Sequence, residues 1–89
     1  MSNNFKIERK HDVLARIPFS KATLHRKIND GSFPPSISLG ANSVGFLSHE
    51  IDTVIAAMAL DKDLRAVVSE LLERRQSLFE ETYYTALAA

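Results

Sequence analysis

A short helix with well-marked ends lies between Pro18 and Gly31. Ser20 is a favourable N-cap, because its hydroxyl can accept a hydrogen bond from the unpaired amides of the first turn. Gly31 is a favourable end, because glycine readily adopts the left-handed conformation that closes helices. Inside the helix, Leu24 and Ile28 are the only large apolar residues, and their i, i+4 spacing places them on one face. The rest of the chain must therefore supply the core to which this narrow apolar face attaches.

The opposite face of this helix is polar and cationic. At about 100° per residue, Ala22, Arg26 and Asn29 lie opposite the apolar pair, with Thr23 and His25 on the flanks. A solvated amphipathic surface helix has the same pattern, so the helix alone leaves both interpretations open. The alternative to that ordinary role is insertion into the major groove of DNA, which requires a short helix with a polar, cationic outer face.

The sequence before this helix predicts a second short helix. Residues 11–16 carry apolar side chains at helical spacing, and Pro18 then stops the helix. Two short helices joined by a turn of about three residues form the skeleton of a helix-turn-helix. Further upstream, Phe5 and Ile7 alternate with polar neighbours, which predicts a short strand or an extended arm.

Residues 33–47 predict a two-stranded hairpin. Two consecutive prolines near its start exclude a helix and a paired central strand. Beyond them, two runs of alternating apolar residues flank a turn that contains glycine and asparagine. We expect one face of this hairpin to pack on the core and its tip to act as a wing that lies along the DNA backbone or enters a minor groove. The apolar residues of the two strands are Ile37, Leu39, Val44 and Phe46.

Two further helices are predicted after the hairpin. Ser48 is a second candidate N-cap, and helical apolar spacing continues to about Leu60. A longer amphipathic stripe then follows Asp61 or Asp63, interrupted at Arg75. A lone helix of this length cannot bury such a stripe, so it must fold back on the domain or pair with another chain, and we favour pairing. The residues predicted to pair are Leu64, Val68, Leu71, Leu72 and Leu78.

Charge is distributed unevenly along a chain whose net charge is zero. Residues 1–31 hold seven basic and three acidic side chains, whereas residues 32–60 and 61–89 each carry a net charge of −2. The positive charge therefore surrounds the capped helix. Phosphate binding favours this asymmetry, because affinity for nucleic acid rises with the number of phosphates neutralised.

Several other classes of protein fit the sequence poorly. The absence of cysteine excludes disulfides, thiolate zinc sites and cysteine catalysis. The three histidines have no metal-binding spacing and no glycine-rich phosphate loop is present, so we expect no enzyme, cofactor or small-molecule substrate. No apolar run reaches the roughly 18 residues of a membrane span, and the polar start lacks a signal peptide. We therefore expect a cytoplasmic protein that does not enter a membrane.

The order of these motifs resembles the AlpA family of small phage and prophage DNA-binding regulators. The signature of that family runs from a Ser-x-x-Thr-[Leu/Ile]-Tyr-Arg helix through a Gly-x-Phe-Pro turn and a Leu-Gly…Val-Gly-Trp hairpin to an acidic helix start. The resemblance covers about residues 5–60 and implies a MerR-like winged helix-turn-helix fold, with phage excisionases as structural relatives. The matching residues are Ser20, Thr23, Leu24, Arg26, Gly31, Phe33, Pro34, Leu39, Gly40, Val44, Gly45, Glu50, Ile51 and Asp52.

Three positions depart from the family pattern. His25 stands where the family usually has tyrosine, and Phe46 stands where it usually has tryptophan. Both replacements are compatible with the same fold. At the tip of the hairpin, Ala41 and Asn42 replace the proline and arginine that are usual in the family. The loss of that arginine weakens the expectation that the wing enters the minor groove.

The combined prediction is a mainly α fold with a small β-hairpin wing, formed by a winged helix-turn-helix domain at 1–60 and a C-terminal amphipathic helix at 61–89. We expect a transcriptional regulator in the cytoplasm of a bacterial host, associated with the nucleoid, that binds double-stranded DNA and forms a homodimer. The helix at 20–30 would enter the major groove. The alternatives are an excisionase that directs recombination and a protein-interaction module that acts through the C-terminal helix. The predicted DNA-binding residues are Ser20, Lys21, Thr23, His25, Arg26, Lys27, Asn42 and Ser43.

Overall fold

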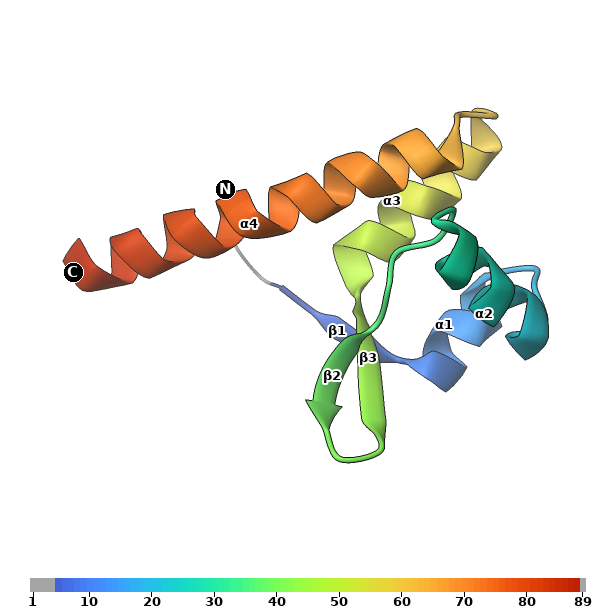
Figure 1. Cartoon of the computed structure of the whole chain (residues 1–89), viewed down its shortest axis with the longest axis horizontal. Coiled ribbons are helices and arrows are strands. Elements are labelled where there is room, and N and C mark those ends of the chain that lie inside the picture. Colours follow the sequence, from blue (N-terminus) through green and yellow to red (C-terminus); the bar gives the residue numbers. More distant parts are fainter. Residues whose placement is uncertain (1–4, 89) are drawn as a thin grey trace.

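The computed structural model describes residues 5–88, which form a small three-stranded sheet and four helices (Figure 1). The predicted mainly α fold, with a hairpin wing and a long C-terminal helix, is confirmed. In chain order the elements are β1 (Ile7–Arg9), α1 (Lys10–Arg16), α2 (Lys21–Asp30), β2 (Ile37–Gly40), β3 (Ser43–Leu47), α3 (Ser48–Ala59) and α4 (Leu64–Ala88).

The three strands form an antiparallel sheet in the order β1-β3-β2. The predicted hairpin supplies β2 and β3, and the N-terminal segment adds β1 to the free edge of β3, where Ile7 lies opposite Leu47. The amide of Ser48 donates to the carbonyl of Lys6 at 2.8 Å and extends this pairing by one bond. Of the two possibilities for the N-terminal segment, the structure shows a strand.

The core lies between the sheet and the helices and receives side chains from every helix. Phe33 and Phe46 meet edge to face at its centre, with ring centroids 6.1 Å apart. The predicted anchor of α2 is confirmed, because Leu24 is fully buried and Ile28 packs against the same cluster. The buried hydrophobic members are Val13, Ile17, Leu24, Phe33, Phe46, Ile51, Val54 and Leu71.

Capping residues set both ends of α2 and the start of α4, as predicted. The amide of Thr23 donates to the hydroxyl of Ser20 at 3.2 Å, which places Ser20 at the N-cap of α2. Gly31 ends the same helix with φ of 85°, a left-handed conformation that only glycine adopts without steric cost. At the start of α4, Asp63 rather than Asp61 accepts hydrogen bonds from the amides of the first turn.

The predicted N-cap at Ser48 is wrong. Ser48 is already the first residue of α3, and its hydroxyl donates to a carboxylate oxygen of Glu8 at 2.6 Å instead of capping the helix. The pairing of β1 with β3 brings this carboxylate beside the helix start. An N-cap residue precedes the helix and its hydroxyl accepts from an amide, whereas Ser48 lies inside the first turn and its hydroxyl donates to a charged acceptor, which forms a strong hydrogen bond.

The two strands of the hairpin direct their apolar residues to opposite faces of the sheet, contrary to the predicted single core face. Residues directly opposed in an antiparallel pair project to the same face. Ser38 lies opposite Val44, whereas Ile37 lies opposite Gly45 and so points away from Phe46. The register set by the turn therefore sends Ile37 to the outer face of the sheet, because a shift of one residue exchanges the faces of a strand.

The N-terminal strand shows the same inversion. Glu8 lies opposite Phe46 and is buried on the inner face, whereas the apolar Ile7 is 46% exposed on the outer face. The buried Glu8 carboxylate binds Arg16 and Ser48. Arg16 also binds Asp52, and this hydrogen bond, with the charges of both carboxylates, raises the pKa of the guanidinium.

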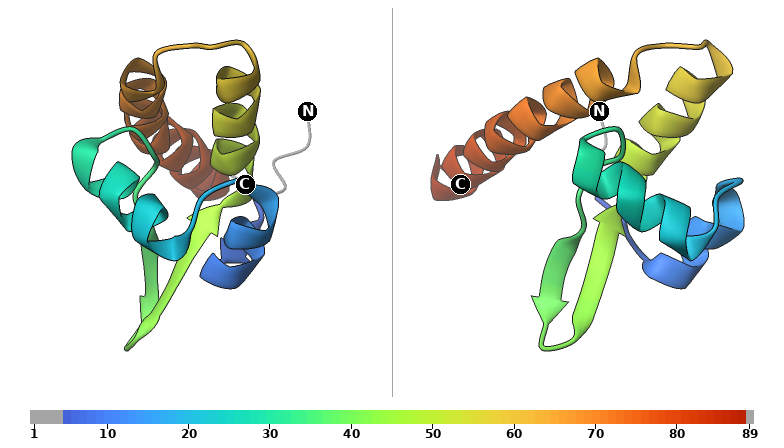
Figure 2. Two further views of the ribbon diagram at one scale, coloured as in Figure 1. Left: turned by 90° about the vertical axis from the view of Figure 1, so that its right-hand side faces the viewer. Right: turned by 45° about the vertical axis from the view of Figure 1, so that its right-hand side comes forward.

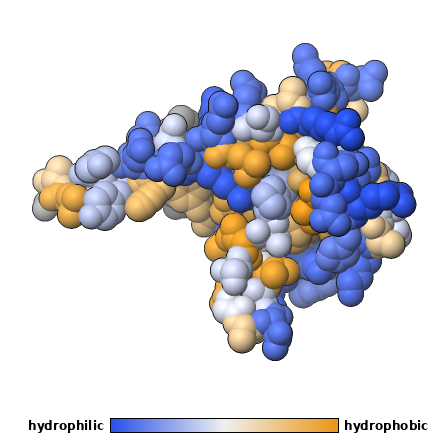
Figure 3. Space-filling model, viewed as in Figure 1, coloured by the Kyte–Doolittle hydropathy of each residue, from blue (hydrophilic) through white to orange (hydrophobic). Residues whose placement is uncertain are grey.

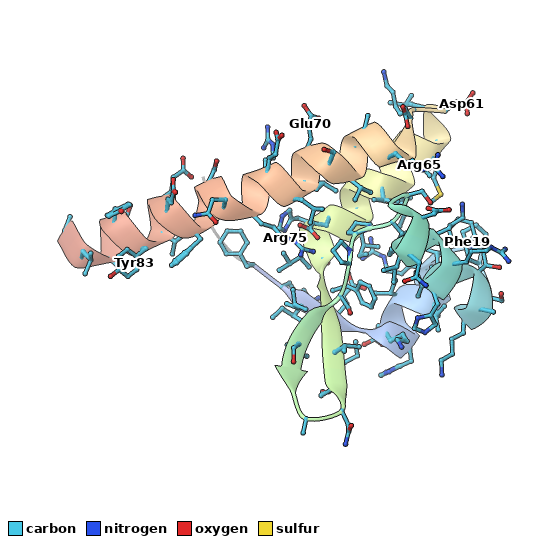
Figure 4. All side chains as sticks on the ribbon, in the orientation of Figure 1. Phe19, Asp61, Arg65, Glu70, Arg75 and Tyr83 are labelled. Carbon is cyan, nitrogen blue, oxygen red and sulfur yellow. The ribbon has the colours of Figure 1, made fainter. Side chains whose placement is uncertain are left out.

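A buried ion pair joins α3 to α4. Glu50 is only 1% exposed, and Arg75 donates to its two carboxylate oxygens at 2.6 and 2.8 Å. The same guanidinium donates to the carbonyl of Pro35 at 2.9 Å, in the segment that leads into β2. Arg75, which interrupts the apolar stripe in the sequence, therefore connects α4 to both the core helix and the base of the hairpin (Figure 4).

The first half of α4 folds back on the domain. Val68 and Leu71 are buried, and Leu64 packs partly against the core. These three residues therefore pack within the protomer. Of the five residues predicted to pair with another chain, this leaves Leu72 and Leu78. The second half of α4 projects beyond the rest of the molecule (Figures 1 and 2). Within residues 5–88, no helix has the length and apolar character that a bilayer crossing requires.

Replacing Arg75 by Ala should destabilise the fold strongly, because it leaves the Glu50 carboxylate buried without its partner. The expected loss is about 3 kcal/mol in the free energy of unfolding, at the lower end for a buried pair because the Arg75 side chain is still 24% exposed. Urea unfolding followed by circular dichroism measures it. Arg74→Ala, at an exposed position on the same helix, is the matched control and should change stability by less than about 0.5 kcal/mol. Equal stability of the two variants would contradict this role of the ion pair.

Candidate nucleic-acid interface

Helix α2 presents its predicted polar face to solvent. Lys21, Ala22, His25 and Arg26 are exposed, and Asn29 continues the exposed face toward the C-terminal end of the helix. Because Leu24 anchors the other side in the core, the helix cannot rotate to bury these residues. The outer face is therefore a fixed surface that is accessible to a large ligand.

The side chains at the start of α2 form a local hydrogen-bond network. The hydroxyl of Ser20 donates to the hydroxyl of Thr23 at 3.0 Å, and the guanidinium of Arg26 donates to the same oxygen at 3.4 Å. Thr23 thus links the N-cap to the central arginine of the face. Arg26 thus contacts Thr23 through one guanidinium nitrogen while its side chain lies exposed on the outer face.

The first helix, α1, adds a basic residue, Lys10, to this face. The sequence did not predict Lys10 as a DNA-binding residue. The ammonium of Lys10, the first residue of α1, lies 3.2 Å from Nε2 of His25. The excess of positive charge in residues 1–31 indicated a basic surface in this part of the chain. Only the packing of α1 beside α2 shows which of those basic residues lies on the outer face of α2. Lys10 and His25 together form a second polar group on the same surface.

Two other cations of this region have structural partners. The ammonium of Lys27 lies 4.9 Å from the centre of the Phe19 ring, so this residue is held at the edge of the face rather than at its centre. Arg16 binds Glu8 and Asp52, and its charge is therefore compensated within the fold. The charge available for phosphates is consequently smaller than the count of basic residues implies.

The tip of the hairpin is polar but carries no charged side chain. Asn42 adopts the left-handed conformation, with φ of 62°, and lies exposed at the turn, and Ser43 is half-buried beside it. The tip stands apart from α2 in each ribbon view (Figures 1 and 2). The structure therefore brings together six of the predicted residues, at and around α2, and leaves Asn42 and Ser43 in a separate place.

The C-terminal end of α2 is tied to α4. The guanidinium of Arg65 donates to the carbonyl of Asp30 at 3.1 Å, and the side chain of Asp30 accepts hydrogen bonds from the hydroxyl and the amide of Ser32 at 2.6 and 2.9 Å. These two Ser32 bonds, the hydroxyl bond first, lower the pKa of Asp30. Both ends of α2 are therefore fixed by side-chain contacts.

Among residues 5–88, no group of three or more side chains is arranged to hold a metal ion. The features that the structure does bring together are two short helices joined by a turn, an exposed polar second helix and a β-hairpin that follows it. This arrangement fits a winged helix-turn-helix protein, extended here by a long C-terminal helix.

The chain belongs to the AlpA family of prophage regulatory proteins. Residues 6–57, more than half of the chain, match the family described as prophage CP4-57 regulatory protein (AlpA). The matched region runs from β1 into α3, close to the extent of the resemblance seen in the motifs, and that resemblance is confirmed. Comparison with curated proteins gave no match, and comparison with solved structures gave none.

The pKa of Asp30 should respond to the loss of Ser32. In the folded protein this pKa lies below the ordinary value of 3.8, and Ser32→Ala should raise it toward that value. A lowered folded pKa means that Asp30 contributes stability above its unfolded pKa and that this contribution disappears as the pH falls through the lower folded value. Carbon-detected NMR titration of the carboxyl group measures the shift. An unchanged pKa in Ser32→Ala would contradict this cause, and Ser36→Ala, at an exposed position, is the control.

Proposed function

We propose that this prophage regulatory protein is a sequence-specific, double-stranded DNA-binding transcriptional regulator. It would act in the cytoplasm of a bacterial host, at the nucleoid, by binding rather than by catalysis and without a cofactor. The observation that carries the proposal is the outer face of α2, which is polar and cationic and is fixed in orientation by Leu24 and by caps at both ends. A helix of this kind, presented on a small rigid domain, is suited to the major groove.

Arg26 is the residue we propose as the main reader of a base. It lies at the centre of the exposed face, and its contact with Thr23 leaves donors of the guanidinium fork free. A guanidinium donates two parallel hydrogen bonds to O6 and N7 of guanine, which provides about 1–3 kcal/mol of discrimination against other bases. Thr23 would contact a thymine methyl group or a phosphate from the flank of the same helix.

The other polar residues of the face would position the protein on the phosphate backbone. Lys21 is exposed in the first turn, Lys27 lies at the edge of the face, and His25 lies beside Lys10. Contacts of this kind fix register and orientation but read little sequence. The hydroxyl of Ser20, at the amino end of α2, lies where a phosphate is also favoured by the helix dipole.

The wing would contribute a weaker contact. Its tip has Asn42 and Ser43 but no cation, so it can hydrogen-bond to a phosphate without adding charge neutralisation. We therefore assign most of the binding free energy to α2 and to Lys10. In this proposal residues 1–60 carry DNA recognition, and residues 61–89 provide an element that joins two protomers.

An excisionase is the second candidate function, since it would use the same fold on adjacent sites that it bends. The exposed aromatic residues of α4 favour a third possibility, in which that helix recruits another protein. The exposed, polar and cationic outer face of α2 favours a regulator over the interaction module. Binding to a single site, or to one pair of half-sites, without bending would support a regulator over an excisionase.

Selection from random duplex DNA tests the proposal directly. The full-length protein should retain a defined motif, and its affinity should fall steeply between about 50 and 200 mM salt, because binding releases counterions from phosphates. Sequencing of the retained duplexes identifies the motif, and fluorescence anisotropy with one retained duplex measures the affinity. Failure to retain any duplex at low salt would contradict DNA binding as the function.

Arg26→Ala should weaken binding to the selected motif by about 1–3 kcal/mol and relax the preference at one base pair. Lys21→Ala should weaken binding to all sequences similarly and reduce the dependence on salt, since it removes a contact of the phosphate type. Arg74→Ala, which removes an exposed positive charge from α4, is the matched control and should leave the affinity for DNA unchanged. An Arg26→Ala protein that selects the same motif with the same stringency would exclude Arg26 as a base reader.

A further inference from the structure

The outer face of the sheet is apolar, and within residues 5–88 it leaves Ile7 and Leu39 exposed. A Cβ atom placed on Gly45 would lie 2.5 Å from a methyl group of Ile7 and 2.9 Å from one of Leu39, so the side chains of β1 and β2 converge over the middle strand. Ile37 lies opposite Gly45 on this face, and Leu39 is 40% exposed. Hydrophobic residues are visible over the hairpin in Figure 3, whereas the side of α1 and α2 is mainly hydrophilic. We call Ile7, Ile37, Leu39 and Gly45 the outer sheet face.

From Leu72 onward, α4 carries a second apolar surface. Leu72, Phe79 and Tyr83 fall within about 40° of one another around the helix, and Phe79 and Tyr83 are 53% and 50% exposed. Their rings lie 5.5 Å apart between centroids, so they form one aromatic surface. Leu87 extends the stripe by a further turn and is also exposed. We call Leu72, Phe79, Tyr83 and Leu87 the distal stripe.

These two surfaces do not meet within one chain. α4 is a continuous helix of 25 residues, and its distal half leads away from the sheet (Figures 1 and 2). Figure 4 shows that Arg75 and Tyr83 point from α4 toward the side on which the sheet lies, whereas Glu70 points to the opposite side. The residues of the distal stripe are therefore exposed instead of packing on the sheet of their own protomer.

The charges that border the two surfaces are complementary. Arg9 lies opposite Gly45, at the margin of the outer sheet face, and is exposed. Glu73 and Glu80 are one heptad apart on one flank of the distal stripe and are exposed. Within residues 5–88, none of these three side chains forms an ion pair. A basic margin on one surface thus corresponds to an acidic margin on the other.

We propose that a second copy of this chain covers both surfaces. In a twofold dimer, the distal stripe of each protomer packs across the outer sheet face of the other, with Glu80 of each protomer beside Arg9 of the other. Helix on sheet is a standard way to bury the free apolar face of a sheet. Twofold symmetry forms each contact twice, which is how one chain satisfies two different exposed surfaces with a single partner.

This inference deepens the dimer named in the proposed function and rests on it for its consequence on DNA. Two domains held by exchanged helices would present two copies of α2, and the protein would then bind paired half-sites at a fixed spacing. The dimer itself requires no DNA. Its failure and the failure of DNA recognition are therefore separable by experiment.

Sedimentation velocity of the full-length protein, without DNA and at micromolar concentration, tests the dimer. The expected mass is twice the 9.9 kDa of one chain. Leu39→Asp should raise the dimer dissociation constant by about a hundredfold or more, because it places an unpaired charge inside the interface. Circular dichroism checks that this variant remains folded. A wild-type protein that sediments as a single chain throughout would overturn the proposal.

Charge reversal tests which surfaces are joined. Arg9→Glu and Glu80→Arg should each raise the dissociation constant about tenfold, and the double variant should return it to near the wild-type value. Arg74→Glu reverses a charge on the opposite side of α4 and is the matched control, which should have no effect. A dimer that survives Leu39→Asp, or a double variant that shows no rescue, would mean that the stripes pair with each other and would overturn the assignment.

Binding of the monomeric Leu39→Asp protein to the selected DNA separates the two questions. Retained binding to a single half-site, with loss of the preference for paired sites, is expected and supports both the dimer surface and DNA recognition by α2. Unchanged preference for paired sites would overturn the dimer geometry while leaving DNA recognition intact.

Discussion

The ion pair between Glu50 and Arg75 is the interaction on which the arrangement of the molecule depends. A carboxylate with 1% exposure requires a fixed cationic partner, and a helix in the core cannot supply one from its own apolar face. Arg75 provides it from α4, and the same guanidinium binds the carbonyl of Pro35. One side chain thereby fixes the long helix, the first turn of α3 and the entry to the hairpin relative to one another.

A second charged cluster on the other side of α3 fixes the position of α1, and through it that of α2. Glu8 on β1, Arg16 on α1 and Asp52 on α3 form one connected group, and Ser48 joins it through Glu8. Because α2 follows α1 after a short turn, this cluster also determines where the outer face of α2 points. The two clusters together enclose α3, so a helix with no part in the candidate DNA surface controls the geometry of that surface.

Much of the fold and of the candidate site could be predicted from residues that act locally. The ends of α2 depend on Ser20 and Gly31, which act within one turn of the chain, and the buried anchor Leu24 follows from helical spacing. The motifs that recur at fixed spacing were sufficient to place the chain in its family. Lys10 was missed as a member of the polar face, because its position beside His25 depends on the packing of two helices.

The sequence alone was sufficient to predict the four helices and the hairpin, both ends of α2, and which face of α2 is polar. Three features depended on the packing of the whole chain: which faces of the strands are buried, the hydrogen bond from Ser48 to Glu8 in place of a helix cap, and the role of Arg75 as the partner of the buried Glu50. The physical reason is the range of the interactions. Caps and helical periodicity act within a few residues, whereas strand register and side-chain hydrogen bonds between elements depend on segments up to 40 residues apart. A shift of one residue in register exchanges the two faces of a strand.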